Sequence, residues 1–147
     1  MAGLTAERDM TLLNMMSDND KLIFVKTLVR LADADGNIDE GEKEFITKLF
    51  KAFELSETLA KEIKATTDEE VVKLAANISN RQVAMELIKE MCMLANSDGD
   101  LSDREIVFIG KVGLAMNLEL EKIEQISQWV IDRIIWLEEG KIIFEKV

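Results

Sequence analysis

Two similar segments, each acidic and centred on a glycine, set the strongest limit on how this chain can fold. The segment "LADADGNIDEGE" occupies residues 31–42, and "LANSDGDLSDRE" follows sixty-three positions later at residues 94–105. When residues 31–63 are aligned with residues 94–126, eleven of the positions are identical. Agreement over such a continuous span indicates an internal duplication. The chain is therefore expected to contain two copies of one unit and a C-terminal helical extension, over residues 22–66, 85–130 and up to 147.

The spacing of apolar residues predicts helices along the whole chain. Leu22, Val25, Val29 and Ala32 recur at helical intervals, proline is absent, and no segment alternates as a strand would. Capping residues predict where seven or eight helices begin: Thr5, Ser17 or Asp18, Asp39, Ser56, Thr67, Ser79, Ser102 and a position near Glu119. We therefore expect one all-α domain over residues 1–147, with the two repeats packed about a pseudo-twofold axis.

Composition limits the classes of partner. The 147 residues are 48% apolar and 32% charged, which is typical of a single folded domain with a hydrophobic core. The formal net charge of −11 would repel a phosphate backbone, so nucleic acid is not an expected partner. The sequence contains neither a signal peptide nor an apolar run long enough to enter a membrane, so we expect a cytoplasmic protein without membrane insertion.

The absence of histidine restricts the chemistry further. Without histidine, the chain cannot form Ser-His-Asp or Cys-His catalytic sets or the histidine-containing motifs of zinc proteases. Cys92 is the single cysteine and lies in an apolar helical run, so we interpret it as a buried structural thiol. A protein without catalytic activity is therefore expected. The alternative is a Mg²⁺-dependent hydrolase, because such an enzyme could use carboxylates alone.

The acidic segments have the ligand spacing of the EF-hand calcium loop, in which glycine occupies the sixth of twelve positions. With Gly36 and Gly99 at that position, oxygen-bearing side chains fall at the third, fifth, seventh, ninth and twelfth positions. The first position differs, since Leu31 and Leu94 replace the usual aspartate. The candidate ligands of a divalent cation, Ca²⁺ or Mg²⁺, are Asp33, Asp35, Asn37, Asp39, Glu42, Asn96, Asp98, Asp100 and Glu105.

The same segments also have an interpretation that needs no metal. The glycine would end one helix, Asp39 or Ser102 would cap the next, and Glu42 or Glu105 would complete a capping box. This interpretation leaves several close carboxylates unexplained, and a cation would relieve their mutual repulsion. Metal binding is therefore the first hypothesis, and a solvated helix–loop–helix junction is the second.

The two segments resemble the TerB-like family, which is named for a tellurite-resistance protein and also includes the N-terminal domain of a DnaJ-type co-chaperone. The resemblance covers residues 22–130 and is carried by an Ala-Asp-Gly or Ser-Asp-Gly motif, followed by an apolar residue and a glutamate, as in residues 34–38 with Glu42 and residues 97–101 with Glu105. It implies an all-helical duplicated domain in which acidic residues chelate a divalent metal. It also implies a non-enzymatic role in stress response, tellurite resistance or protein interaction.

The segment "QWVIDRIIWLEEGKIIF" at residues 128–144 carries more apolar side chains than one amphipathic stripe requires. Core packing is the first interpretation. The alternative is an interaction module in which Trp129, Ile134 and Trp136 contact a protein partner or a second copy of the chain. Gly140 is a predicted weak point or break in this last helix. Gly110 and Gly113 are predicted to permit a close helix crossing.

Overall fold

The computed structural model describes residues 16–32, 67–96 and 101–145, together with positions 44, 47, 48, 51 and 52. Within these ranges the chain forms five helices and no strands: α2 (Asp18–Ala32), α5 (Asp68–Ala75), α6 (Arg81–Ala95), α7 (Asp103–Ala115) and α8 (Leu120–Glu145). The predicted all-α class is confirmed for this part of the chain. The helix count of seven or eight and the duplication remain predictions, because the helix starts at Thr5, Asp39 and Ser56 lie outside the described residues.

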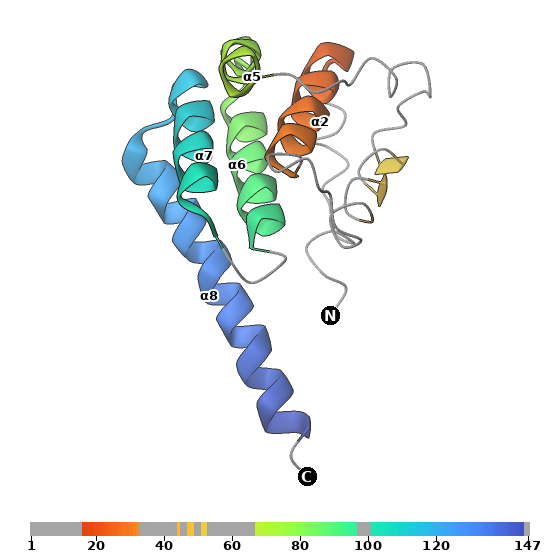
Figure 1. Ribbon diagram of the computed structural model, residues 1–147, viewed down its shortest axis with the longest axis vertical. Helices are drawn as coiled ribbons and strands as arrows, with labels where there is room; N and C mark the ends of the chain where they lie inside the picture. Colours follow the sequence, from red (N-terminus) through yellow and green to blue (C-terminus); the bar gives the residue numbers. More distant parts are fainter. Residues whose placement is uncertain are drawn as a thin grey trace.

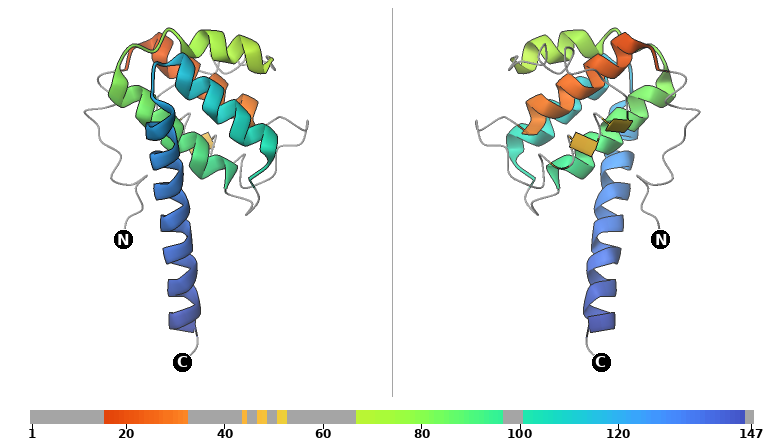
Figure 2. Two further views of the ribbon diagram at one scale, coloured as in Figure 1. Left: turned by 90° about the vertical axis from the view of Figure 1, so that its left-hand side faces the viewer. Right: turned by 90° about the vertical axis from the view of Figure 1, so that its right-hand side faces the viewer.

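Helix α6 is the centre of the described fold. It packs against α2, α7 and α8, while α5 contacts α2 and α7. Figure 1 shows α2, α6 and α7 side by side, with α5 crossing one end of them. Helix α8 begins beside α7, runs along α6 and then extends beyond the other helices, so that its C-terminal half projects from the bundle (Figures 1 and 2).

Apolar burial explains why α6 is central. Its buried residues lie on most of its circumference and include Val83, Leu87, Ile88 and Met91. The surrounding helices contribute large side chains to the same core, among them Phe24 of α2, which is 1% exposed. Each such side chain stabilises the fold by roughly 1.5–3 kcal/mol through its removal from water. The core therefore holds α2 and α7 against α6.

Four of the predicted helix starts agree with the structure, including the one near Glu119, since α8 begins at Leu120, and one is wrong by a residue. The side-chain oxygens of Ser17, Thr67 and Ser102 accept hydrogen bonds from backbone N–H groups three residues ahead, as predicted. Helix α6, however, is capped by Asn80 instead of Ser79, because Asn80 Oδ1 accepts hydrogen bonds from the N–H groups of two residues in the first turn, at 2.9 and 3.1 Å. An amide oxygen that reaches two donors satisfies more of the helix end than one serine hydroxyl would.

A tight turn joins α7 to α8. Asn117 has a φ of 64°, the left-handed conformation in which asparagine is tolerated better than most residues. The N–H of Leu118 donates to the carbonyl of Gly113 at 3.0 Å, which closes the end of α7. The turn sends α8 back along α6 and α7.

The two glycines of α7 have different roles. A Cβ atom on Gly113 would overlap Cδ1 of Ile123, lie 2.7 Å from Cγ1 of the same residue and lie 3.3 Å from Cδ1 of Ile88. A Cβ atom on Gly110 would meet no atom within 4 Å. The predicted close crossing is therefore confirmed at Gly113 and is wrong at Gly110.

Helix α8 runs without interruption from Leu120 to Glu145, so the predicted break at Gly140 is wrong. The backbone of Gly140 continues the helix even though glycine costs about 1 kcal/mol there relative to alanine. None of the described helices combines the length and the apolar character needed to cross a membrane.

Candidate functional site

The second acidic segment ends in a complete capping box. Ser102 Oγ accepts a hydrogen bond from the N–H of Glu105 at 3.2 Å, and Glu105 Oε1 accepts one from the N–H of Ser102 at 3.0 Å. Asn96, earlier in the same segment, follows the end of α6 and donates from Nδ2 to the Cys92 carbonyl at 2.7 Å. Two of the nine candidate metal ligands therefore make local hydrogen bonds to helix ends.

The remaining candidate ligands lie outside the described residues: Asp33, Asp35, Asn37, Asp39, Glu42, Asp98 and Asp100. Across the described ranges, no three acidic or cysteine side chains gather in a group that could hold a metal ion. This finding does not extend to the acidic segments themselves, so the metal site remains a prediction.

Arg104 connects the second acidic segment to the beginning of the first. Arg104 is the second residue of α7. Its guanidinium donates hydrogen bonds to the backbone carbonyls of Arg30 and Leu31, each at 3.4 Å. These carbonyls belong to the last turn of α2, and the first acidic segment starts at Leu31. A cation at this helix end is stabilised by the partial negative charge of the free carbonyls. The two segments are therefore linked by one side chain.

Asp68 completes the network around Arg104. Its Oδ1 accepts hydrogen bonds from Arg104 Nη2 and from Arg30 Nε, both at 2.7 Å. The Arg104 guanidinium also lies over the ring of Phe108, with 5.5 Å between Cζ and the ring centroid. Helices α2, α5 and α7 each contribute one charged side chain to this cluster, which we call the Arg30–Asp68–Arg104 cluster.

The cluster shifts the ionisation of its carboxylate. Partial burial on its own would raise the pKa of Asp68, but the hydrogen bonds and positive charges of Arg30 and Arg104 outweigh it and hold the pKa below the ordinary value. A carboxylate with a lowered pKa stabilises the folded state above its unfolded pKa of about 4, and this contribution is lost as the pH falls through the folded-state pKa. The cluster should therefore weaken in acid.

Replacing Asp68 with asparagine is expected to lower the free energy of unfolding by about 1–2 kcal/mol at pH 7, because two charge-assisted hydrogen bonds become weaker. As the pH falls through the lowered folded-state pKa of Asp68, the difference from the wild type should shrink, because the wild-type carboxylate then loses its charge as well. Urea unfolding followed by circular dichroism at pH 7 and pH 3 measures both values. Glu69→Gln is the matched control, because Glu69 is an exposed carboxylate in the same helical turn. An equal loss in both variants would contradict the role assigned to the cluster.

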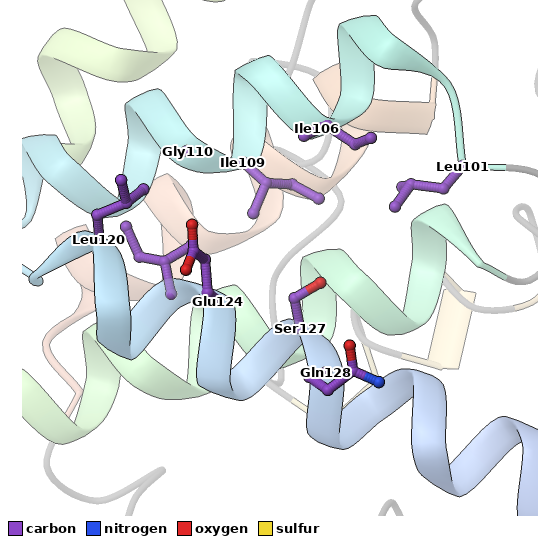
Figure 3. Close-up of a pocket in the computed structure, with 9 residues that line it drawn as sticks. Leu101, Ile106, Ile109, Gly110, Leu120, Glu124, Ser127 and Gln128 are labelled. Atoms are coloured by element: carbon purple, nitrogen blue, oxygen red, sulfur yellow. The ribbon is translucent and has the colours of Figure 1, made fainter.

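A cleft of about 400 Å³ lies between α7 and α8 (Figure 3). Its walls are mainly apolar and include Leu101, Ile106 and Ile109, while Glu124, Ser127 and Gln128 supply the polar groups. A serine nucleophile needs a neighbouring base, and the chain has no histidine to supply the usual one.

Ser127 of α8 has a structural partner in α6, which packs against α8. It hydrogen-bonds the thiol of Cys92, which lies buried in α6. Burial raises the pKa of the Cys92 thiol to about 11, although the hydrogen bond from Ser127 acts in the opposite direction. A thiol with such a pKa is almost entirely protonated at pH 7 and is a poor nucleophile. The prediction that Cys92 is a buried structural thiol is confirmed.

The C-terminal half of α8 exposes a large apolar surface. Trp136 is 67% exposed, Ile143 is 66% exposed and Phe144 is 82% exposed. In the first half of the helix, Ile123 and Val130 are buried against the bundle. The first interpretation of this segment, core packing, is therefore wrong beyond Ile134, because the helix continues past the end of the helices that would cover it (Figure 1).

From Trp129 onward, one side of α8 carries several exposed apolar residues, which we call the distal face of α8, while Ile135 and Ile142 are exposed elsewhere on the helix. Its members are Trp129, Trp136, Leu137, Gly140, Ile143 and Phe144. Two shallow hollows of about 350 and 560 Å³ lie along it, and Trp136 borders both. Of the three residues predicted to contact a partner, Trp129 and Trp136 belong to this face, whereas Ile134 is partly buried against the core.

Sequence reasoning missed the Arg30–Asp68–Arg104 cluster. Its three members are separated by 38 and 36 positions, so no local spacing connects them. The available signal was an arginine inside an acidic segment, at the position where the first copy has Gly41. That difference between the two acidic segments is the only sequence feature that singles out Arg104.

The chain was compared with protein-family models, curated proteins and solved structures. No protein-family model, no curated protein and no solved structure matches it. The resemblance to the TerB-like family therefore stays a prediction from the two acidic segments.

Proposed function

We propose that this protein is a non-enzymatic interaction module that binds another protein through the distal face of α8. The observation that carries the proposal is the exposure of Trp136, Ile143 and Phe144 on a helix that projects from the bundle (Figure 2). Exposed apolar patches of this kind mark interaction sites, and tryptophan is among the residues that contribute most to binding energy.

The proposal predicts contact at the distal face and none on the opposite side of the same helix. A photo-crosslinking amino acid placed at Trp136 or Ile143 is expected to attach a discrete protein when the cells that produce this protein are irradiated. The matched position is Glu138, since two residues correspond to about 200° of rotation around a helix. Gel electrophoresis followed by mass spectrometry identifies what is attached.

A second change tests whether that attachment depends on the face itself. Leu137→Glu with Phe144→Glu should abolish crosslinking from Trp136, because two carboxylates would have to be buried without partners. Both side chains are largely exposed, so the helical circular dichroism spectrum should stay unchanged. Equal crosslinking from Trp136 and Glu138, or crosslinking that survives the double variant, would contradict the proposal.

A second candidate function is the binding of Ca²⁺ or Mg²⁺ by the two acidic segments, as in a TerB-like domain with a cytoplasmic stress-response role. The observation that favours it is Arg104, because this residue of the second segment contacts the carbonyls of Arg30 and Leu31, where the first segment begins. Segments that are held together in this way could pool their oxygen ligands around one or two ions. Thermal unfolding with and without each ion tests this proposal.

A further inference from the structure

We infer that the partner of the distal face is a cationic amphipathic helix, which pairs lengthwise with the C-terminal half of α8. This inference rests on the proposed function and specifies its partner. It depends on three properties of the face: the spacing of its apolar residues, the open position at Gly140 and the charge along its edge.

The spacing of the large side chains suits a second helix. Trp129, Trp136 and Ile143 are separated by seven residues each, and Gly140 lies between the last two. An apolar residue every seven positions forms a nearly straight seam along a helix, into which the side chains of another helix can pack. The seam extends over fifteen residues, which corresponds to about 21 Å of helix length.

Gly140 leaves a gap in this seam. A Cβ atom at that position would meet nothing within 4 Å, so no contact among the described residues requires glycine there. The residue also lies inside a helix, where glycine is unfavourable by about 1 kcal/mol relative to alanine. The gap adjoins Trp136 and Ile143 in the larger hollow, and a side chain of a partner helix could fill it.

Charge distinguishes between possible partners. Asp132 and Glu139 lie three residues after Trp129 and Trp136, so they form an acidic edge along one side of the seam. Arg133 and Lys141 border the two hollows as well and leave the face with a smaller net negative charge. Helix α8 as a whole has six acidic and three basic residues, a net charge of −3, and the full chain has a net charge of −11. A second copy of the chain would bring the same negative charge to the interface. A helix with lysine or arginine beside its apolar residues would be attracted instead.

The two tryptophans of the chain, Trp129 and Trp136, both lie on this face and report its occupation. The probes are two synthetic 18-residue helices with leucines at identical positions, one with lysines and the other with glutamates at the remaining positions. At about 0.05 M salt, the lysine peptide should shift the tryptophan emission to shorter wavelength and bind at least tenfold more tightly than the glutamate peptide. Raising the salt to about 0.5 M should reduce this ratio, because the added ions screen the charges.

Two double variants test whether the acidic edge causes the preference for the lysine peptide. Asp132→Asn with Glu139→Gln should weaken binding of the lysine peptide several-fold and reduce its salt dependence. Asp18→Asn with Glu69→Gln changes the net charge by the same amount at exposed sites on α2 and α5, and it should leave the affinity unchanged. Equal weakening by both pairs would show that only the overall charge matters, which would overturn the assignment.

The outcomes separate this inference from the proposed function. Equal affinity for both peptides, or binding of neither, overturns the cationic partner. Sedimentation equilibrium that shows a dimer, lost in Trp136→Ala, would also overturn it and would identify the partner as a second copy of the chain. In each of these cases, crosslinking from Trp136 would leave the proposed function standing. If crosslinking is absent as well, both fail.

Discussion

Calcium or magnesium at about one hundred times its dissociation constant is expected to raise the free energy of unfolding by about 2.7 kcal/mol. The reason is the repulsion among the carboxylates of the two acidic segments, which a bound cation would replace with attraction. For a chain of this size, the melting temperature should rise by roughly 5–10 °C. Thermal unfolding followed by circular dichroism, with chelator and then with each ion, measures the change.

The variants for this experiment come from the candidate ligands. Asp35→Asn with Asp98→Asn should remove the increase, because both residues occupy the fifth position of the calcium-loop spacing. Asp18→Asn with Glu69→Gln removes the same number of negative charges elsewhere and should retain the increase. If neither ion stabilises the wild-type protein at millimolar concentration, the divalent-cation proposal is wrong.

Gly113→Ala is expected to destabilise the protein, whereas Gly110→Ala should stabilise it by up to about 1 kcal/mol. Alanine at Gly110 gains the helix propensity and meets no neighbouring atom. Alanine at Gly113 would force Ile123 and Ile88 to move, which costs roughly 1–3 kcal/mol in a packed core. The two variants should therefore differ by about 1–4 kcal/mol in urea unfolding, although their sequence change is identical.

A third variant attributes the loss to one contact. In Ile123→Val the Cδ1 atom that a new Cβ at Gly113 would overlap is absent, so adding Gly113→Ala to this background should cost less than it costs in the wild type. An unchanged cost would mean that the crossing of α7 and α8 is not limited by Ile123.

The local features of the fold could be predicted because they depend on residues close together in the sequence. Ser17, Thr67 and Ser102 each have a donor three positions ahead, and the sequence displays that spacing directly. Ser79 and Asn80 show the limit of such reasoning. Both are good capping residues, and only the path of the backbone decides that Asn80 reaches the first turn.

Features that depend on distant parts of the chain could not be predicted. The apolar pattern of α8 is nearly the same before and after Ile134, yet Val130 is buried and Phe144 is exposed. The difference arises because α8 is longer than α6 and α7 and extends beyond them (Figure 1). The exposure of its C-terminal residues therefore depends on the lengths of the other helices. The pairing of Arg104 with Asp68 likewise requires α5 and α7 to be adjacent.

The candidate metal site was predicted from residue types and spacing alone, and it stays a prediction. Of its nine members, the structure describes Asn96 and Glu105, and each makes the hydrogen bond of a helix end. A carboxylate that completes a capping box still has a second oxygen available to other partners. The capping role of Glu105 is therefore compatible with either interpretation of the segment.

The projection of α8 has a consequence for its motions. Beyond Ile134 the helix has backbone hydrogen bonds but few neighbours, and isolated helices of about a dozen residues are only marginally stable in water. The amide hydrogens of its last three turns should therefore exchange with deuterium far faster than those of α6. A binding partner would then have to supply the energy that orders these turns, and slowed exchange on binding would mark the residues it covers.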